Sequence, residues 1–281
     1  MKTIVNVYKD HGLWKYPPPG IGDYLRGCCY LHYKSRMVKS PGFVARANLD
    51  LSPASRFLDY ESVHHPGERQ DLIDAKEYFE PERDGDVDQT INDFLRSDRE
   101  TLYLSTNRSW RGVDDEPDRA ALDHTAKILN FSPAFGNTVY QKTCHISHPY
   151  MLLHIRDSDR SKSKRWMSWD AWRFRLRVAA LIRKKIHGHT SANQAIVCVS
   201  NNEPLRDHLC QKHGYINLQT EVQNTGHKGI LSEGELLDMA LMKSAASLTA
   251  LSYFGWNSGF SVWVTRLFGV PATYYNRYSR L

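Results

Sequence analysis

An apolar run, Tyr150–Leu153, is followed by polar side chains whose types suit the binding of an anion. The run predicts a buried strand of a parallel sheet, and such sheets bind ligands beyond the carboxyl ends of their strands. His154 and Arg156 should share one face of that strand because side chains alternate. The guanidinium of Arg156 stays charged at any working pH and matches the geometry of a diphosphate. Arg156 could instead pair with Asp157 or Asp159, and a single strand histidine is also typical of a satisfied core residue.

A later junction between a strand and a helix could hold phosphate groups. Residues 248–254 predict a strand and 260–268 an apolar helix. The first N–H groups of a helix have no partner within it, and small residues leave them accessible to an anion. Together with Arg156, this junction predicts a ligand that carries a nucleoside diphosphate. The residues expected to line it are Asn257, Ser258, Gly259, Phe260 and Ser261.

A glycine loop precedes the first predicted helix. Gly20 and Gly22 follow a strand, where glycines let the backbone approach a ligand closely. Asp23 and Arg26 would then lie in the first helical turn and face the ligand. A tight turn after the three prolines of 17–19 explains the glycines equally well, and Asp23 could simply cap the helix.

Asp238 interrupts an otherwise apolar helix. A buried carboxylate needs a partner, and the edge of a nucleobase could be that partner. A backbone N–H group or Arg266 would serve a purely structural role equally well.

Pairs of aspartates one residue apart raise the alternative of a metal site. Asp157 and Asp159 follow a predicted strand, where they could hold Mg²⁺ or Mn²⁺ against a diphosphate. The similar triplets within 84–88 have no strand before them and are discounted. A metal-dependent transferase of the GT-A type is therefore one alternative, and chelation would test it.

The basic segment from Lys162 to Lys185 suggests a second alternative, a surface for nucleic acid. Trp166, Trp169 and Trp172 recur every third residue among many arginines and lysines. This spacing is more typical of a helix that packs its aromatics inward and its charges outward. A nucleic-acid partner is therefore the less favoured interpretation.

Composition narrows the class of protein. The chain has 281 residues, 41% of them hydrophobic, and a formal net charge of +6, which favours an anionic partner. Its five cysteines are odd in number and lack the CxxC spacing, so we expect buried thiols rather than disulfides or structural zinc. The N-terminus reads as a strand, and the longest apolar region, 236–264, contains Asp238, Lys243 and Asn257. We therefore expect a soluble cytoplasmic protein without a membrane span.

Strand-like and helix-like segments alternate, which predicts an α/β fold. The expected layout is two Rossmann-like domains, residues 1–145 and 146–281, facing a central cleft that holds the ligand. Strands are expected at 4–8, 43–51, 101–105, 150–155, 194–200 and 248–254, with a further short strand after 213. Helices are expected at 23–35, 118–129, 168–186, 205–213, 233–246 and 260–268. The charged stretch 61–99 is expected to be surface loop and short helix.

With these residues in place, the chain resembles the fucosyltransferase superfamily of two-domain (GT-B) glycosyltransferases, which includes α1,2-, α1,6- and protein O-fucosyltransferases. The order of motifs carries the resemblance over most of the chain. The motifs are Gly20-Ile-Gly22 with Asp23 and Arg26, Phe131-Ser-Pro133, His154-Ile-Arg156, the helix Asp238–Ser244, and Ser258-Gly-Phe260-Ser261 ahead of Trp263.

The resemblance implies a set of roles. Arg156 would hold the donor diphosphate, Ser258, Phe260 and Ser261 would line its pocket, and Asp238 would bind the base. Gly22 and Asp23 would face the reacting sugar. It also implies inversion at the anomeric carbon with no metal required, and Asp23 and Asp159 are the candidate bases. The acceptor would be a glycan hydroxyl.

Two departures from the family pattern affect the choice of donor. Asp157 stands where members usually carry a second basic residue, and the cradle is Ser-Gly-Phe-Ser rather than Ser-Ser-Phe. GDP-fucose is the first choice of donor, and a UDP-sugar such as UDP-xylose is the alternative. Cytosolic action would suit a bacterium or a virus that builds its own glycans.

Overall fold

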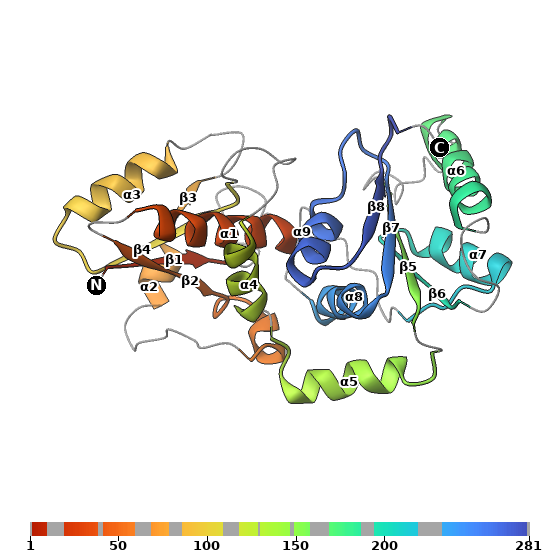
Figure 1. Cartoon of the computed structure of the whole chain (residues 1–281), viewed down its shortest axis with the longest axis horizontal. Coiled ribbons are helices and arrows are strands. Elements are labelled where there is room, and N and C mark those ends of the chain that lie inside the picture. The colour runs from red at the N-terminus through yellow and green to blue at the C-terminus, as the bar shows by residue number, and fades with distance from the viewer. Residues whose placement is uncertain are drawn as a thin grey trace. The chain divides into compact units, whose positions relative to one another are not determined.

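The structure is a computed structural model of the whole chain. It describes residues 2–9, 20–38, 42–59, 69–78, 86–108, 118–128, 130–146, 149–157, 169–186, 194–218 and 232–279. These residues form an α/β protein with two four-stranded sheets, and the strands within each sheet pair in parallel (Figure 1). The predicted α/β class is therefore confirmed. The chain divides into two compact units, residues 1–136 with 225–233 and residues 137–224 with 234–281, and each contains one sheet.

The first unit has the sheet order β2-β1-β4-β3. The central strand β1 is buried on both faces: Ile4 packs in the cluster that contains α1 and α3 residues, and Val5 and Val7 pack beside Leu72 of α2. Its elements are β1 (Lys2–Val7), α1 (Ile21–Met37), β2 (Phe43–Asn48), the 3₁₀ turn Pro53–Phe57, α2 (Arg69–Ile73), β3 (Lys76–Tyr78), α3 (Val87–Arg96), β4 (Thr101–Thr106) and α4 (Arg119–Ile128).

A glycine allows α1 to approach this sheet closely. A Cβ atom on Gly27 would lie 1.8 Å from the carbonyl oxygen of Thr106 in β4, so no other residue fits there without movement of the backbone. The neighbouring Cys28 and Cys29 are buried, as predicted, and are free thiols.

The second unit has the order β6-β5-β7-β8. From β5 the chain first adds β6 on one side and later β7 on the other, so the winding direction reverses between β5 and β7. Its elements are α5 (Pro133–Thr143), which spans the division, β5 (Met151–Arg156), α6 (Trp169–Leu181), the π-helical turn Ile182–Ile186, β6 (Ile196–Ser200), α7 (Glu203–His213), α8 (Glu233–Ser244), β7 (Ser247–Ser252), α9 (Gly259–Phe268) and β8 (Ala272–Tyr275).

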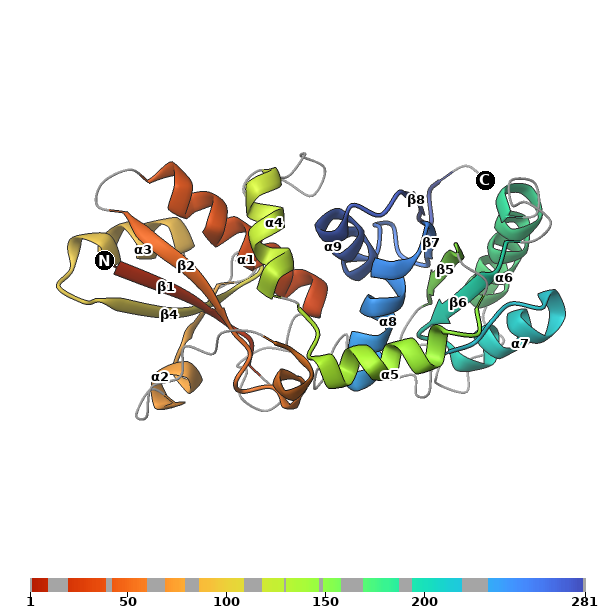
Figure 2. The ribbon, with the colours of Figure 1, turned by 60° about the horizontal axis from the view of Figure 1, so that its bottom comes forward.

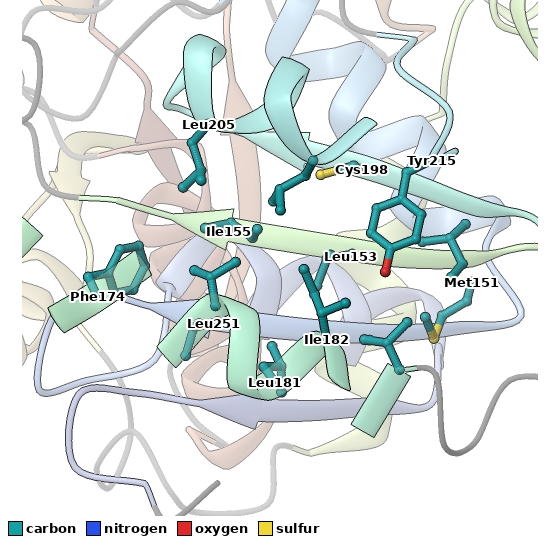
Figure 3. Packing of buried hydrophobic residues seen from close by; sticks show 14 residues of the cluster. Met151, Leu153, Ile155, Phe174, Leu181, Ile182, Cys198, Leu205, Tyr215 and Leu251 are labelled. Atoms are coloured by element: carbon teal, nitrogen blue, oxygen red, sulfur yellow. The ribbon is translucent and has the colours of Figure 1, made fainter. Parts of the chain in front are cut away.

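Helices cover both faces of this second sheet, α6 and α7 on one and α8 and α9 on the other (Figures 1 and 2). Met151, Leu153 and Ile155 of β5 point into the hydrophobic cluster shown in Figure 3, which also contains residues of α6 and α7. Because strand side chains alternate, His154 and Arg156 belong to the opposite face, the one that α8 and α9 cover. His154 contacts Ser261 of α9 on that face, and the same alternation predicts that Arg156 lies there too.

The structure corrects several details of the sequence analysis. The charged stretch 61–99, expected to be surface loop and short helix, contains the helices α2 and α3 and also a strand of the sheet, β3, which was not expected. The edge strand β8 was not expected, and the short strand expected after 213 is an isolated bridge at Ile216. Trp172 is 50% exposed, so the inward packing expected of the tryptophans is wrong there, and Trp166 lies outside the described residues. In the described part of the chain, no helix has the length and apolar character needed to cross a membrane.

Candidate functional site

His154 joins the end of β5 to the first turn of α9. Its Nδ1 lies 2.5 Å from the Oγ of Ser261, and its ring meets that of Phe260 edge-on at 6.1 Å. The imidazole is 5% exposed. Burial, reinforced by the positive charge of Arg156, lowers the pKa of His154 to about 3, so the ring is neutral at physiological pH. His154 therefore acts as an uncharged link between the two motifs.

Arg156 is the last residue of β5, half-buried at the carboxyl edge of the sheet. It is in register with Ser252 of β7, and its carbonyl oxygen accepts a hydrogen bond of 2.8 Å from the amide of Tyr253. Arg156 thus stands at the point where the winding reverses between β5 and β7. In doubly wound sheets this is the position of ligand-binding crevices.

The N-terminus of α9 has the features of an anion cradle. Ser258 is the N-cap residue, but its side chain makes no capping hydrogen bond. The first N–H groups of a helix lack partners within the helix, so those of α9 suit an oxyanion. Asn276 donates to Asn257 at 3.4 Å, which ties the segment before α9 to the chain beyond β8. Ser261 is fully buried and holds His154, so it is a supporting residue of the cradle.

Asp157 has a structural role that the sequence analysis missed. Its carboxylate accepts a hydrogen bond of 2.5 Å from the side chain of Asn202, and its backbone amide donates to Asn201 at 2.7 Å. Asp157 is 5% exposed, and it fixes the end of β5 to the end of β6. Asp159, its partner in the proposed metal pair, lies outside the described residues. Among the residues that the structure describes, no three His, Cys, Asp or Glu side chains gather as metal ligands would.

The glycine loop leads into α1 of the first unit. Gly20 is the N-cap, and its carbonyl accepts from the amides of Asp23 and Tyr24, so the alternative that Asp23 caps the helix is wrong. Gly22 is buried, and Asp23 is half-buried with its carboxylate 3.4 Å from Arg26. Arg26 also donates through Nε to the carbonyl of Asn107. The carboxylate that was predicted as a base therefore has a cationic neighbour.

Asp238 lies near the middle of α8, half-buried between buried apolar neighbours of that helix. The helix is held to the sheet by the hydroxyl of Tyr150, which donates to the carbonyl of Leu241 at 2.6 Å. Asp238 thus belongs to the same face of the second sheet as His154. Whether its carboxylate meets a nucleobase remains a prediction.

The sequence comparisons return no match: no family model and no curated protein matches the chain. Solved structures do match. The α-1,6-fucosyltransferase NodZ soaked with GDP-fucose superposes with a TM-score of 0.55 and 12% identity over 95% of this chain and 92% of that one. NodZ from Bradyrhizobium gives a TM-score of 0.53 and 14% identity, covering 94% and 91%.

The chain shares the fold of these fucosyltransferases. FUT1 of Arabidopsis thaliana, in complex with GDP, agrees with a TM-score of 0.53 and 14% identity over 97% of this chain and 70% of that one. The resemblance stated from the motifs is thus confirmed at the level of fold. At these identities the likeness concerns the fold, so the assignment of chemistry has to rest on the residues of the second unit.

Proposed function

We propose that the chain is an inverting glycosyltransferase that takes a sugar from a nucleoside-diphosphate donor. The observation that carries the proposal is the hydrogen bond between His154 and Ser261. It joins the strand end that bears Arg156 to the anion cradle of α9. The fucosyltransferase fold supports the same assignment.

The proposed mechanism assigns the departing diphosphate to Arg156 and to the N–H groups of α9. As the glycosidic bond of the donor breaks, negative charge develops on the leaving phosphate, and fixed donors stabilise it. The neutral ring of His154 positions Ser261 and adds no charge. Because the charge of Arg156 and the dipole of α9 would compensate the charge on the leaving phosphate, we expect turnover without a metal ion.

Inversion requires an acceptor hydroxyl to attack the anomeric carbon from the side opposite the diphosphate, with loss of its proton to a base. Asp23 and Asp159 remain the candidate bases. Asp23 is half-buried at the start of α1, and its carboxylate lies 3.4 Å from the guanidinium of Arg26. Residues 1–145 would form the acceptor-side domain and 146–281 the domain that binds the donor.

GDP-fucose is the first choice of donor because the matching NodZ crystal was soaked with it. Asp238 would accept hydrogen bonds from the base, and Gly20 and Gly22 would leave room for the sugar. The Ser-Gly-Phe-Ser form of the cradle keeps a UDP-sugar such as UDP-xylose as the second candidate. The metal-dependent alternative is weakened because Asn202 already engages the carboxylate of Asp157.

A donor-consumption assay tests this proposal. Purified protein is incubated with GDP-fucose or UDP-xylose and a mixture of glycan acceptors, with and without EDTA, and released nucleotide is measured. We expect release from one donor, unchanged by EDTA, and a loss of about 10²-fold or more in Arg156→Ala. Arg183→Ala, an exposed arginine of the same unit, is the matched control. Release from neither donor, or equal rates in Arg156→Ala, would contradict the proposal.

A further inference from the structure

A second basic site lies in the second unit, outside the cradle of α9. It is a pocket of about 210 Å³ lined by Arg173, Phe174, Arg177, Tyr253 and Arg277. Among the lining residues that the structure describes, three are arginines and none is acidic. Phe174 and Tyr253 meet edge-on at 5.4 Å and form its apolar wall. Such a pocket favours a ligand that combines a negative charge with an apolar surface.

Arg177 fixes the chain that closes this pocket. Its terminal nitrogen donates to the carbonyl of Asn276 at 3.0 Å and to that of Ser279 at 2.6 Å. Its Nε is buried and has no hydrogen-bond partner among the described residues. A buried N–H without an acceptor is costly, so an anion in the pocket would stabilise this guanidinium.

Arg277 connects the pocket to the neighbouring loop. Its guanidinium lies over the ring of Tyr253 at 5.9 Å, and its backbone amide donates to the carbonyl of Phe254 at 2.8 Å. The pocket is therefore built from segments that hold one another in place. A preformed site loses less entropy when a ligand binds.

Further aromatic rings lie next to the pocket, on the segment that follows Tyr253 and on the segment that follows Arg277. Phe254 and Trp256 stack with 5.0 Å between centroids and 16° between planes, and Trp256 is 67% exposed. Tyr278 is 78% exposed and its ring lies over Gly255, where a Cβ would come within 2.5 Å of it. We call Phe254, Trp256 and Tyr278 the aromatic platform. Rings held this way offer flat apolar faces to a ligand.

The platform and the pocket also adjoin the proposed donor site. Tyr253, which lines the pocket, donates its amide hydrogen to the carbonyl of Arg156. Asn257, which follows the platform, belongs to the segment that leads into α9. A molecule held here would lie beside the residue proposed to bind the donor diphosphate.

We propose that the arginine pocket and the aromatic platform together bind a sugar that bears a phosphate or sulfate group, as part of the acceptor. The oxyanion would lie among Arg173, Arg177 and Arg277, where several guanidinium donors converge. The apolar face of the sugar ring, made of its C–H groups, would rest on Trp256. The assignment to the acceptor rests on the proposed transferase function, whereas the existence of the site does not.

Titration calorimetry on the full chain tests this inference, with glucose 6-phosphate, glucose 6-sulfate, glucose and inorganic phosphate as probes. The variants are Arg173→Gln, Arg277→Gln and Trp256→Ala, with Arg183→Gln as the matched control on an exposed arginine. The melting temperature of each variant checks its fold. Arg177 is left intact because it anchors the C-terminal segment.

We expect glucose 6-phosphate or 6-sulfate to bind at least about fivefold more tightly than inorganic phosphate, and glucose not to bind. Each arginine substitution should weaken binding about tenfold, as loss of a charge-assisted hydrogen bond implies. Trp256→Ala should weaken the binding of the sugar esters but leave the binding of inorganic phosphate unchanged. Binding of none of the esters, or ester binding that both arginine variants leave unchanged, would overturn the inference. Equal affinity for inorganic phosphate and for the esters would also overturn it, because the sugar would then contribute nothing to binding.

A nucleotide arm separates this inference from the proposed function. GDP and UDP are titrated into the wild-type protein and the two arginine variants. Ester binding with no binding of either nucleotide would refute the transferase proposal and the acceptor assignment. Nucleotide binding without ester binding would refute only the proposal that the pocket binds a sugar ester. Loss of nucleotide binding in Arg173→Gln and Arg277→Gln would show that the pocket binds the donor and would overturn the inference.

Discussion

At the scale of single residues, the candidate site depends on how charge is distributed around one neutral histidine. His154 is buried, its pKa is lowered to about 3, and it bonds to Ser261 while Arg156 supplies the positive charge two residues later. Asp157, which the sequence alone suggested as a metal ligand or as an ion-pair partner of Arg156, accepts a hydrogen bond from the side chain of Asn202. A buried carboxylate with an amide donor serves packing, and the guanidinium of Arg156 is the group that we propose binds the ligand.

The lowered pKa of His154 has a consequence for stability. The unfolded chain binds a proton on this residue near pH 6.5, whereas the folded chain does so only near pH 3. Between these pH values the unfolded state binds more protons than the folded state, so the unfolded population grows as the pH falls. Stability should be intact above pH 6.5 and should decrease by up to ~1.4 kcal/mol per pH unit below it from this group alone.

Denaturant unfolding from pH 7.5 to pH 4.5 measures this dependence. His154→Gln keeps a polar partner for Ser261 but cannot take up a proton, so its stability should vary less with pH than that of the wild type. The half-buried His32, whose pKa burial lowers to about 4, should contribute in the same direction in both proteins. Identical pH profiles for wild type and His154→Gln would show that His154 is not buried in its neutral form.

At the scale of elements, the sequence predicted the strands and helices that carry strong local signals. The strand expected at 150–155 and the helix expected at 205–213 are examples, and they are present as β5 and α7. In contrast, β3 was missed because it contains the charged residue Glu77. This carboxylate is buried 3.4 Å from the ammonium group of Lys9, which follows β1 and is distant in sequence. The contacts of Asp157 with Asn201 and Asn202 span 44 and 45 residues, so no local pattern could indicate them.

Helix α3 was obscured for a different reason. Val87, Ile91, Phe94 and Leu95 form its buried stripe at helical spacing, a pattern that was present in the sequence. The many charges around it and the preceding Pro81 and Gly85 favoured surface loop with only short helix. The buried stripe was the signal that could have identified it.

The packing of α1 against β4 gives a prediction at this scale. Gly27→Ala would place a methyl group 1.8 Å from the carbonyl oxygen of Thr106, so the helix must move away from the sheet. We expect a loss of ~1–3 kcal/mol in the free energy of unfolding. Gly136→Ala in α5 is the matched control, because its Cβ would meet nothing within 4 Å. The control should be neutral or stabilising by up to ~1 kcal/mol, and equal effects of the two substitutions in denaturant unfolding would contradict the account.

At the scale of the whole molecule, the two parallel sheets each contain a reversal of winding, and the second one assembles the candidate site from parts far apart in sequence. His154 and Ser261 are separated by 107 residues, yet the order β6-β5-β7-β8 brings β5 next to the strand that leads into α9. The sequence indicated both motifs and their order. It could not indicate the bond between them, nor the arginine pocket, whose residues come from α6, the end of β7 and the C-terminal segment.

The central claim is that Arg156 and the N-terminus of α9 bind a nucleoside diphosphate. Titration calorimetry of GDP and UDP into the wild-type protein and Arg156→Ala, in the presence of EDTA, tests it most directly. The account predicts binding of one nucleotide to the wild type and a roughly 10- to 100-fold weaker affinity in the variant, as expected for loss of charge-assisted hydrogen bonds. Binding that Arg156→Ala leaves unchanged, or no binding of either nucleotide to the wild type, would contradict it.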